Sequence, residues 1–125
     1  EYINDSKATN LHALEACLRS QERPIVLIAG GKDKELDYTP LRAELNGQVR
    51  AMVLIGEIAG QLKQTFGDLL PCQCAADMAD AVRLATEVSQ AGDAIILSPG
   101  TSSFDMYTGY AQRGDVFREA VSALN

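Results

Sequence analysis

Short, continuous apolar runs alternate along the chain with longer stretches in which apolar residues recur every three or four positions. The short runs are rich in β-branched side chains, which is typical of strands buried on both faces of a parallel sheet. They lie at residues 24–29, 49–55 and 94–97. A fourth run at 69–75 contains Pro71, which favours a position at the edge of the sheet.

The stretches with helical spacing lie between these runs. We expect helices at residues 8–20, 40–45, 57–65, 77–90 and 115–124. The clearest of these predicted helices is the one at 77–90, which has an apolar stripe made by Met78, Val82, Leu84, Ala85 and Val88. Tyr2 and Ile3 form only a short apolar start, to which we assign no element. Alternating strands and helices predict an α/β layer architecture with a mostly parallel sheet flanked by helices.

Composition and charge are those of one soluble globular domain. The 125 residues are 46% hydrophobic and 22% charged, and we expect residues 1–125 to form a single domain. The net charge of -6 argues against nucleic-acid binding, because no basic face is available for phosphates. We also expect no membrane span and no signal peptide. The chain begins with Glu1 rather than Met, so we expect it to be part of a longer protein.

The three cysteines, Cys17, Cys72 and Cys74, form no disulfide framework and suit a reducing cytosol. On a strand, Cys72 and Cys74 would share one face. We interpret them as small buried side chains rather than as a metal site, because only two candidate ligands lie close together in the sequence.

Three polar segments can meet at one edge of the predicted sheet. Residues 30–34 follow a strand and end in Lys34, residues 98–103 follow another strand, and residues 5–10 precede the first predicted helix. Ligands of open α/β sheets bind beyond the carboxyl ends of the strands. The lysines, hydroxyls and backbone amides of these segments suit a small dianion with a carboxylate at each end. Solvated surface loops are the alternative, since loops are polar in any case.

Two further observations concern bound anions. Lys7 lies at the start of a predicted helix, where a cation is mildly unfavourable, so it suggests that an anion is bound nearby. The chain has neither the Gly-x-x-x-x-Gly-Lys-Ser/Thr phosphate loop nor the full Gly-x-Gly-x-x-Gly pattern. We therefore do not expect it to hold a nucleoside triphosphate by itself.

The motifs in these segments are similar to those of a known family. They are Asn4-Asp5-Ser6-Lys7-Ala8-Thr9-Asn10, Gly30-Gly31-x-x-Lys34, Leu97-Ser98-Pro99, Ser103-Phe104-Asp105 and Arg113-Gly114-Asp115-x-Phe117. In this order, and over nearly the whole chain, they resemble the C-terminal domain of the D-glutamate-adding Mur ligases of peptidoglycan synthesis. The resemblance implies a Rossmann-like three-layer sandwich within a cytoplasmic, three-domain enzyme that we expect to be a monomer.

The resemblance also implies a reaction, the ATP-dependent joining of D-glutamate to UDP-N-acetylmuramoyl-L-alanine. In this family an N-terminal domain holds the UDP-sugar, and a central domain, absent from this chain, holds ATP and magnesium. ATP phosphorylates the alanine carboxylate, and the amine of D-glutamate then displaces the phosphate, a better leaving group. The C-terminal domain brings the amino acid and closes over the ATP site, so we expect this chain alone to fold but not to catalyse ligation.

Individual roles for D-glutamate follow from the resemblance, position by position. Thr9 and Lys34 match positions that hold one carboxylate of D-glutamate, and Ser103 and Tyr110 match positions near the other. The family usually has Phe in place of Tyr110, at a contact made through the backbone. Residues 100–102, Gly-Thr-Ser, also differ from the family's usual Ala-Cys-Ala, which affects the expected shape of this loop.

The same comparison implies a nucleotide contact. Asp5 matches a position that faces the ribose after domain closure, and Lys7 one that faces the phosphates. We assign no catalytic residue and no metal ligand in this chain. Lys32 adds a charge beside Lys34, and His12 lies in the first predicted helix; we interpret both as ordinary surface or packing side chains.

Two alternatives stay open. The chain could be the matching domain of another Mur ligase or of a folylpolyglutamate synthase, which share the fold and the amide-forming chemistry. The motif at residues 5–10 argues against this. The chain could also be a stand-alone module that binds a small anion without catalysis.

Overall fold

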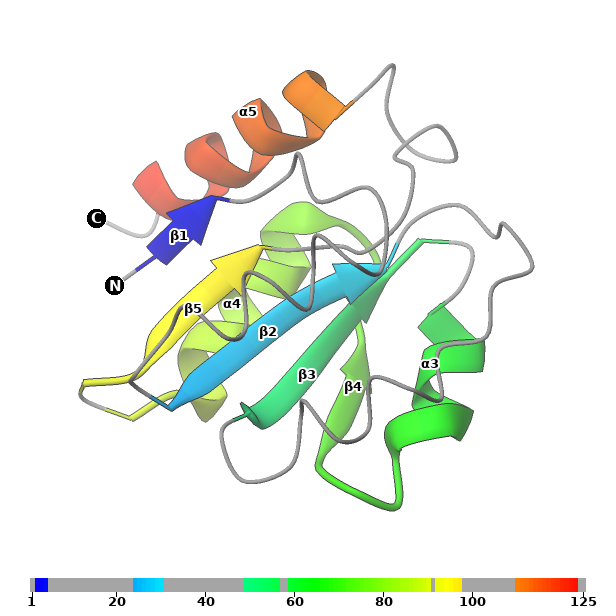
Figure 1. The fold of residues 1–125 in the computed structure, drawn as a ribbon. Coiled ribbons are helices and arrows are strands. Elements are labelled where there is room, and N and C mark those ends of the chain that lie inside the picture. Colours follow the sequence, from blue (N-terminus) through cyan, green and yellow to red (C-terminus); the bar gives the residue numbers. More distant parts are fainter. Residues whose placement is uncertain are drawn as a thin grey trace.

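The computed structural model describes residues 2–4, 24–30, 49–56, 59–90, 92–97 and 110–123 (Figure 1). In chain order these form β1 (Tyr2–Asn4), β2 (Ile25–Gly30), β3 (Val49–Ile55), α3 (Ala59–Phe66), β4 (Cys72–Cys74), α4 (Met78–Val88), β5 (Ala94–Leu97) and α5 (Tyr110–Ser122).

The five strands form one sheet in the order β1-β5-β2-β3-β4, and each of the four neighbouring pairs is parallel. All the carboxyl ends of the strands therefore lie at one edge of the sheet. This confirms the prediction of a mostly parallel sheet. The edge position of β4 is confirmed as well, although β4 is shorter than the predicted run at 69–75.

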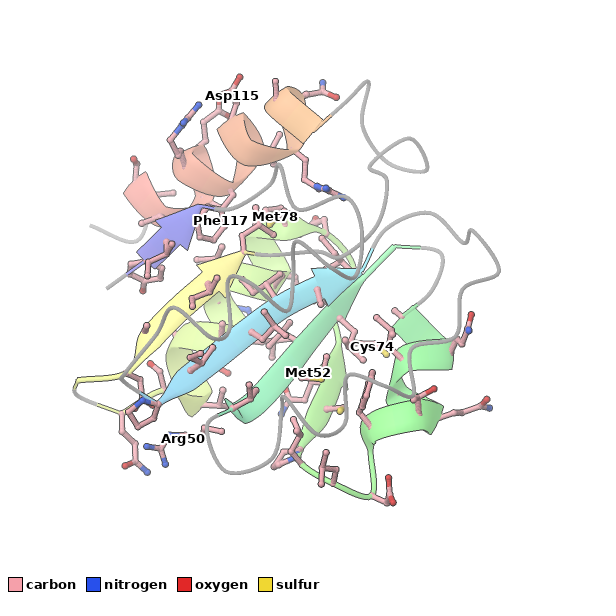
Figure 2. All side chains as sticks on the ribbon, viewed as in Figure 1. Arg50, Met52, Cys74, Met78, Asp115 and Phe117 are labelled. Atoms are coloured by element: carbon pink, nitrogen blue, oxygen red, sulfur yellow. The ribbon has the colours of Figure 1, made fainter. Side chains whose placement is uncertain are left out.

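Two hydrophobic clusters cover the two faces of the sheet. Along β2, Ile25, Leu27 and Ala29 belong to one cluster, and Val26 and Ile28 belong to the other. The first cluster contains Leu62 and Phe66 of α3, and the second contains Met78 of α4 and Phe117 of α5 (Figure 2). Helices on both faces make three layers, which confirms the predicted α/β architecture and agrees with the Rossmann-like sandwich that the resemblance implies.

The predicted boundaries differ from the observed ones mainly at the two ends of the chain. The apolar start at Tyr2 is a strand, which pairs with β5, and sequence analysis missed it. Helix α5 begins at Tyr110, five residues before the predicted start at Asp115. The predicted helices at 8–20 and 40–45 lie outside the described residues. None of the helices in the described ranges combines the length and apolar character needed to cross a bilayer.

A hydrogen bond fastens the short strand β1 to the layer beneath it. The hydroxyls of Tyr2 and Thr86 lie 2.8 Å apart, and Thr86 donates its own proton to the carbonyl of Val82 on α4. Because a hydroxyl has a single proton, Tyr2 is the donor to Thr86. A strand of only three residues thus gains a tie to a helix in addition to its pairing with β5.

An ion pair joins two strands at the amino edge of the sheet. Asp93 directly precedes β5, and Arg50 is the second residue of β3, with β2 between them. The Asp93 carboxylate accepts bonds from Nε of Arg50 at 2.7 Å, Nη2 of Arg50 at 3.1 Å and the amide of Gln90 at 2.9 Å. Its side chain is only 2% exposed. The Arg50 guanidinium, followed by the Gln90 amide, holds the pKa of Asp93 below its ordinary value against the opposing effect of burial.

We expect Asp93→Asn to lower the free energy of unfolding of the chain at neutral pH by about 1.5–3 kcal/mol, the range for a hydrogen bond to a charged group. A lowered folded-state pKa contributes stability above the unfolded pKa of about 3.9, which is lost as the pH falls through the folded value. Urea unfolding at a series of pH values should therefore show a gap between wild type and variant at pH 7 that narrows below about pH 4. A gap that stays constant down to pH 3 would contradict this origin.

Two hydrogen bonds between side chains and backbone amides stabilise the start of α4. Asp77, the N-cap, accepts a hydrogen bond from the amide of Asp80 at 2.8 Å, and the Asp80 carboxylate accepts one from the amide of Ala76 at 3.0 Å. This Ala76 amide, followed by Arg83, lowers the pKa of Asp80. The bond to Asp77 satisfies a backbone donor that a helix leaves free at its start, and the bond from Ala76 ties the residue before the N-cap to the first turn.

We expect Asp77→Ala to destabilise the chain by about 1 kcal/mol, the usual cost of losing an N-cap acceptor. Asp77→Asn is the matched control, because the amide oxygen of Asn caps as well as a carboxylate. Thermal unfolding of both variants measures the difference. Equal midpoints for the two variants would show that the cap contributes nothing.

Candidate functional site

The carboxyl ends of β1, β5 and β2 lie side by side. In the register of the sheet Asn4 pairs with Leu97, and Leu97 pairs with Ile28 of β2. Each of the three polar segments identified in the sequence begins where one of these strands ends. Neighbouring strands are about 4.8 Å apart, so the three starting points span about 10 Å.

The middle position at this edge belongs to β5. Segments 5–10 and 31–34 start from the strands on either side of it, although they are separated in sequence from residues 98–103. Three neighbouring strands therefore end at the edge where ligands of open α/β sheets bind. The ends of β1, β5 and β2 are compatible with the prediction that the three segments meet at one edge, and the meeting itself stays a prediction because residues 5–10, 31–34 and 98–103 lie outside the described residues.

Gly30 ends β2 in a conformation that requires glycine. Its φ of +129° lies where L-residues are rare. A Cβ atom added there would overlap the carbonyl oxygen of Ile55, which pairs with Gly30 in the sheet. The strand can therefore leave the sheet at this point only because position 30 has no side chain.

Helix α5 begins toward the same edge (Figure 1). Its last turns lie near Tyr2 at the amino end of β1, so the helix runs opposite to the strands and its first turn lies toward the carboxyl edge. Arg113, one turn further, is 1% exposed, and Gly114 is buried beside it. In the sequence Arg113 was noted only as part of a motif. Its burial shows that its side chain lies in the interior of the domain.

Most of the predicted site residues lie outside the described residues. These are Asp5, Lys7, Thr9, Lys34 and Ser103, together with Lys32 and His12. Of the set, Tyr110 alone is placed, as the first residue of α5. The structure therefore supports the positions of the strand ends, and the roles of the individual side chains stay predictions.

The ion pairs that the structure describes lie away from this edge or on helix surfaces. Arg50 and Asp93 bind each other at the opposite edge, and on α4 Arg83 contacts Asp80 at 2.5 Å and Glu87 at 3.0 Å. Asp80, followed by Glu87, raises the pKa of Arg83. The charges of these pairs are already balanced, so they are poor candidates for anion binding.

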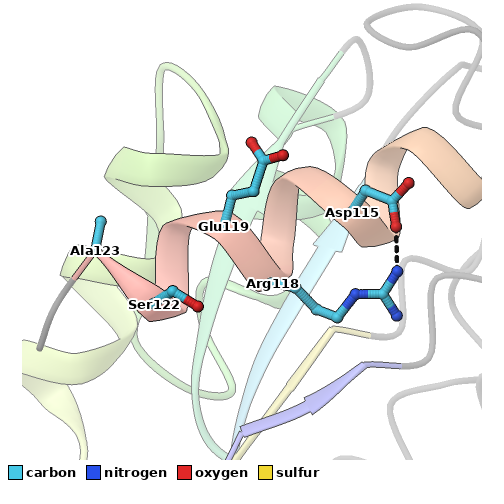
Figure 3. Close-up of a pocket in the computed structure, with 5 residues that line it drawn as sticks. All are labelled: Asp115, Arg118, Glu119, Ser122 and Ala123. Carbon is cyan, nitrogen blue, oxygen red and sulfur yellow. Dashed lines mark hydrogen bonds and ion pairs between the residues drawn. The ribbon is translucent and has the colours of Figure 1, made fainter.

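Two hollows lie along α5. An open one of about 570 Å³ is lined by Asp115, Arg118, Glu119, Ser122 and Ala123, and Arg118 there is bound to Asp115 (Figure 3). A smaller one of about 320 Å³ lies between Tyr2 and the apolar side chains of Phe117 and Val121. Both lie on the flank of the helix rather than at its start, so neither coincides with the edge where the polar segments begin.

The cysteine prediction is wrong in one respect. Cys72 is half-buried against the core, and burial raises the pKa of its thiol, but Cys74 is exposed. A two-residue period on an edge strand does not bury both side chains, because little of the core extends past β4. Within the described ranges no group of three or more His, Cys, Asp or Glu side chains could hold a metal ion.

Comparisons with known proteins agree with this architecture. A solved domain of a Haemophilus ducreyi protein, named as a UDP-N-acetylmuramate:L-alanyl-gamma-D-glutamyl-diaminopimelate ligase, superimposes with a TM-score of 0.56. It covers all of this chain, and this chain covers 88% of it, at 15% sequence identity. At that identity the likeness shows the fold alone.

Curated relatives are much closer in sequence, and each is named UDP-N-acetylmuramoylalanine–D-glutamate ligase. Identity is 49% in Salinibacter ruber, 46% in Chloroherpeton thalassium and 41% in Bdellovibrio bacteriovorus, over 98%, 99% and 96% of this chain. The matches cover 27%, 26% and 26% of those proteins. The chain thus spans about a quarter of the length of the curated relatives it matches.

The family described as "Mur ligase, glutamate ligase domain" matches residues 1–101, which is about four fifths of the chain. This match, the identity to the curated relatives and the parallel three-layer fold all agree. The chain belongs to the Mur ligase, glutamate ligase domain family.

Proposed function

We propose that residues 1–125 form the amino-acid-binding domain of an ATP-dependent ligase that adds D-glutamate to UDP-N-acetylmuramoyl-L-alanine in peptidoglycan synthesis. The observation that carries the proposal is the adjacency of β1, β5 and β2, whose carboxyl ends lead into the three polar segments. The names of the curated relatives, at 41–49% identity, support D-glutamate as the amino acid.

The two ends of D-glutamate require two groups of contacts. Lys34 and Thr9, in segments that follow β2 and β1, would hold one carboxylate as a point charge and a hydroxyl donor. Ser103, in the segment after β5, and Tyr110, at the start of α5, would hold the other. Binding both carboxylates fixes the orientation of the amine, which is the nucleophile.

ATP and magnesium would be held mainly by the rest of the ligase. When bound, ATP would supply the phosphoryl group that activates the alanine carboxylate of the other substrate. Asp5 and Lys7 would face the ribose and the phosphates when the domains close, and closure would exclude water from the acyl phosphate. The task of this chain is to bind and orient the amino acid.

The setting of this reaction follows from its substrates. UDP-sugars and ATP belong to the cytoplasm, and the product serves cell-wall growth, cell shape and cell division. We propose that the ligase acts there as a monomer. Among the rival functions, another Mur ligase or a folylpolyglutamate synthase is disfavoured by the names of the curated relatives, and a stand-alone anion-binding module is disfavoured by their greater length.

We expect Lys34→Ala in the full-length ligase to raise the KM for D-glutamate by about 30- to 1,000-fold, because a desolvated lysine–carboxylate contact contributes about 2–4 kcal/mol. Steady-state kinetics with D-glutamate as the varied substrate measure this. Lys63→Ala, which removes an exposed lysine of α3, is the control and should leave the KM unchanged.

Substrate choice tests the same proposal. L-glutamate, L-lysine and diaminopimelate should be poor substitutes for D-glutamate in the wild-type ligase. An unchanged KM for D-glutamate in Lys34→Ala, or equal turnover of another amino acid, would contradict the assignment.

The 125-residue chain by itself should give no ligation, because ATP and the UDP-sugar would be bound elsewhere in the ligase. The measurement is phosphate release in the presence of all three substrates, with the full-length ligase as the positive control. Circular dichroism of the same sample confirms that the chain is folded. Robust turnover by the folded chain alone would overturn the division of tasks described above.

A further inference from the structure

The junction between β2 and the segment that ends in Lys34 is unusually constrained. Gly30 is the last residue of β2, with a φ of +129°. A Cβ placed there would overlap the carbonyl oxygen of Ile55 and lie 3.0 Å from the carbonyl carbon and the amide nitrogen of the same residue. Two independent constraints, backbone conformation and space, therefore both require glycine at this position.

The obstacle is backbone rather than a flexible side chain. Ile55 is the last residue of β3 and pairs with Gly30 at the end of the ladder. Both strands are interior to the sheet, and Ala29, Leu54 and Ile55 are at most 1% exposed. Strands packed on both faces cannot separate without losing buried contacts. A side chain at position 30 would instead rotate the backbone where the chain leaves β2.

Such a rotation would act on one of the three segments at the edge. The segment that ends in Lys34 starts directly after Gly30, whereas those with Thr9 and Ser103 start from β1 and β5. The chain that follows β3 begins with Gly56, whose φ is +80°, and it belongs to none of the three segments. A change at position 30 would thus displace one contact to the ligand and leave the others in place.

We propose that Gly30 is a positioning residue for the amino-acid site, because its close approach to Ile55 fixes the direction in which the Lys34 segment leaves the sheet. This inference rests on the proposed function, in which Lys34 holds a carboxylate of D-glutamate. In this inference Gly30 acts through the four residues that follow it.

The test is Gly30→Ala in the full-length ligase, with KM measured separately for D-glutamate, ATP and the UDP-sugar substrate. The KM for D-glutamate should rise by at least about tenfold, since displacements on the order of 1 Å are costly at reacting centres. The KM for the UDP-sugar should change less than about twofold, because that substrate is bound elsewhere. A purely structural role would lower the unfolding temperature and the amount of active enzyme without this difference between substrates.

Two other glycines are matched controls. Gly92 also has a positive φ, +92°, but nothing lies within 4 Å of an added Cβ, and it precedes β5 at the amino edge. Gly92→Ala should carry a similar conformational cost and leave every KM unchanged. Gly60, exposed on α3 with open space around it, controls for the added methyl group alone.

A second variant is informative if Gly30→Ala does not fold. One glycine inserted between Gly30 and Gly31 adds no Cβ, so it leaves the pairing with Ile55 intact and changes only where the Lys34 segment begins. It should also raise the KM for D-glutamate selectively. An unchanged KM in this variant, or in folded Gly30→Ala, would overturn the inference.

Lys34→Ala separates this inference from the proposed function. If Lys34→Ala raises the KM for D-glutamate while the position-30 variants do not, the function stands and the role of Gly30 is refuted. If Lys34→Ala has no effect, the function itself fails.

Discussion

Parallel pairing of all five strands is the constraint on which the rest of this structure depends. It forces each connection to cross a face of the sheet, so the strands are covered on both sides and become continuous apolar runs. It also brings every carboxyl end to a single edge. In this order the first strand of the chain lies beside the last one, so segments far apart in sequence begin next to each other.

The two edges of the sheet consequently have different chemistry. At the amino edge, Asp93 and Arg50 neutralise each other across β2. At the carboxyl edge, β2 ends in a glycine pressed against the backbone of β3, and α5 begins with Tyr110. The proposed binding of a doubly charged amino acid concerns the second edge, where the three polar segments begin.

The interior of the fold could be predicted from the sequence, and its margins could not. The predicted bounds of β3 and β5 agree with the observed bounds at both ends, because a strand buried on two faces is a largely continuous run of apolar residues. β1 was not predicted, because a strand of three residues is too short to show the two-residue alternation of a strand. The start of α5 was missed because Gly114 has a low helix propensity, whereas in the structure Arg113 and Gly114 are buried within the helix. Periodicity could indicate where a site should lie, but the roles of Thr9, Lys34 and Ser103 came only from likeness to a family.

The Asp93–Arg50 pair has a consequence for how such a domain can change over evolutionary time. The ion pair contributes stability that is lost at low pH, and it lies at the opposite end of the strands from the proposed ligand contacts. Stability to acid and ligand binding therefore depend on different residues of the chain. A lineage could exchange the pair for apolar packing and gain tolerance to low pH while its choice of amino acid remained the same. Divergence at that end of the sheet would therefore say little about what the enzyme binds.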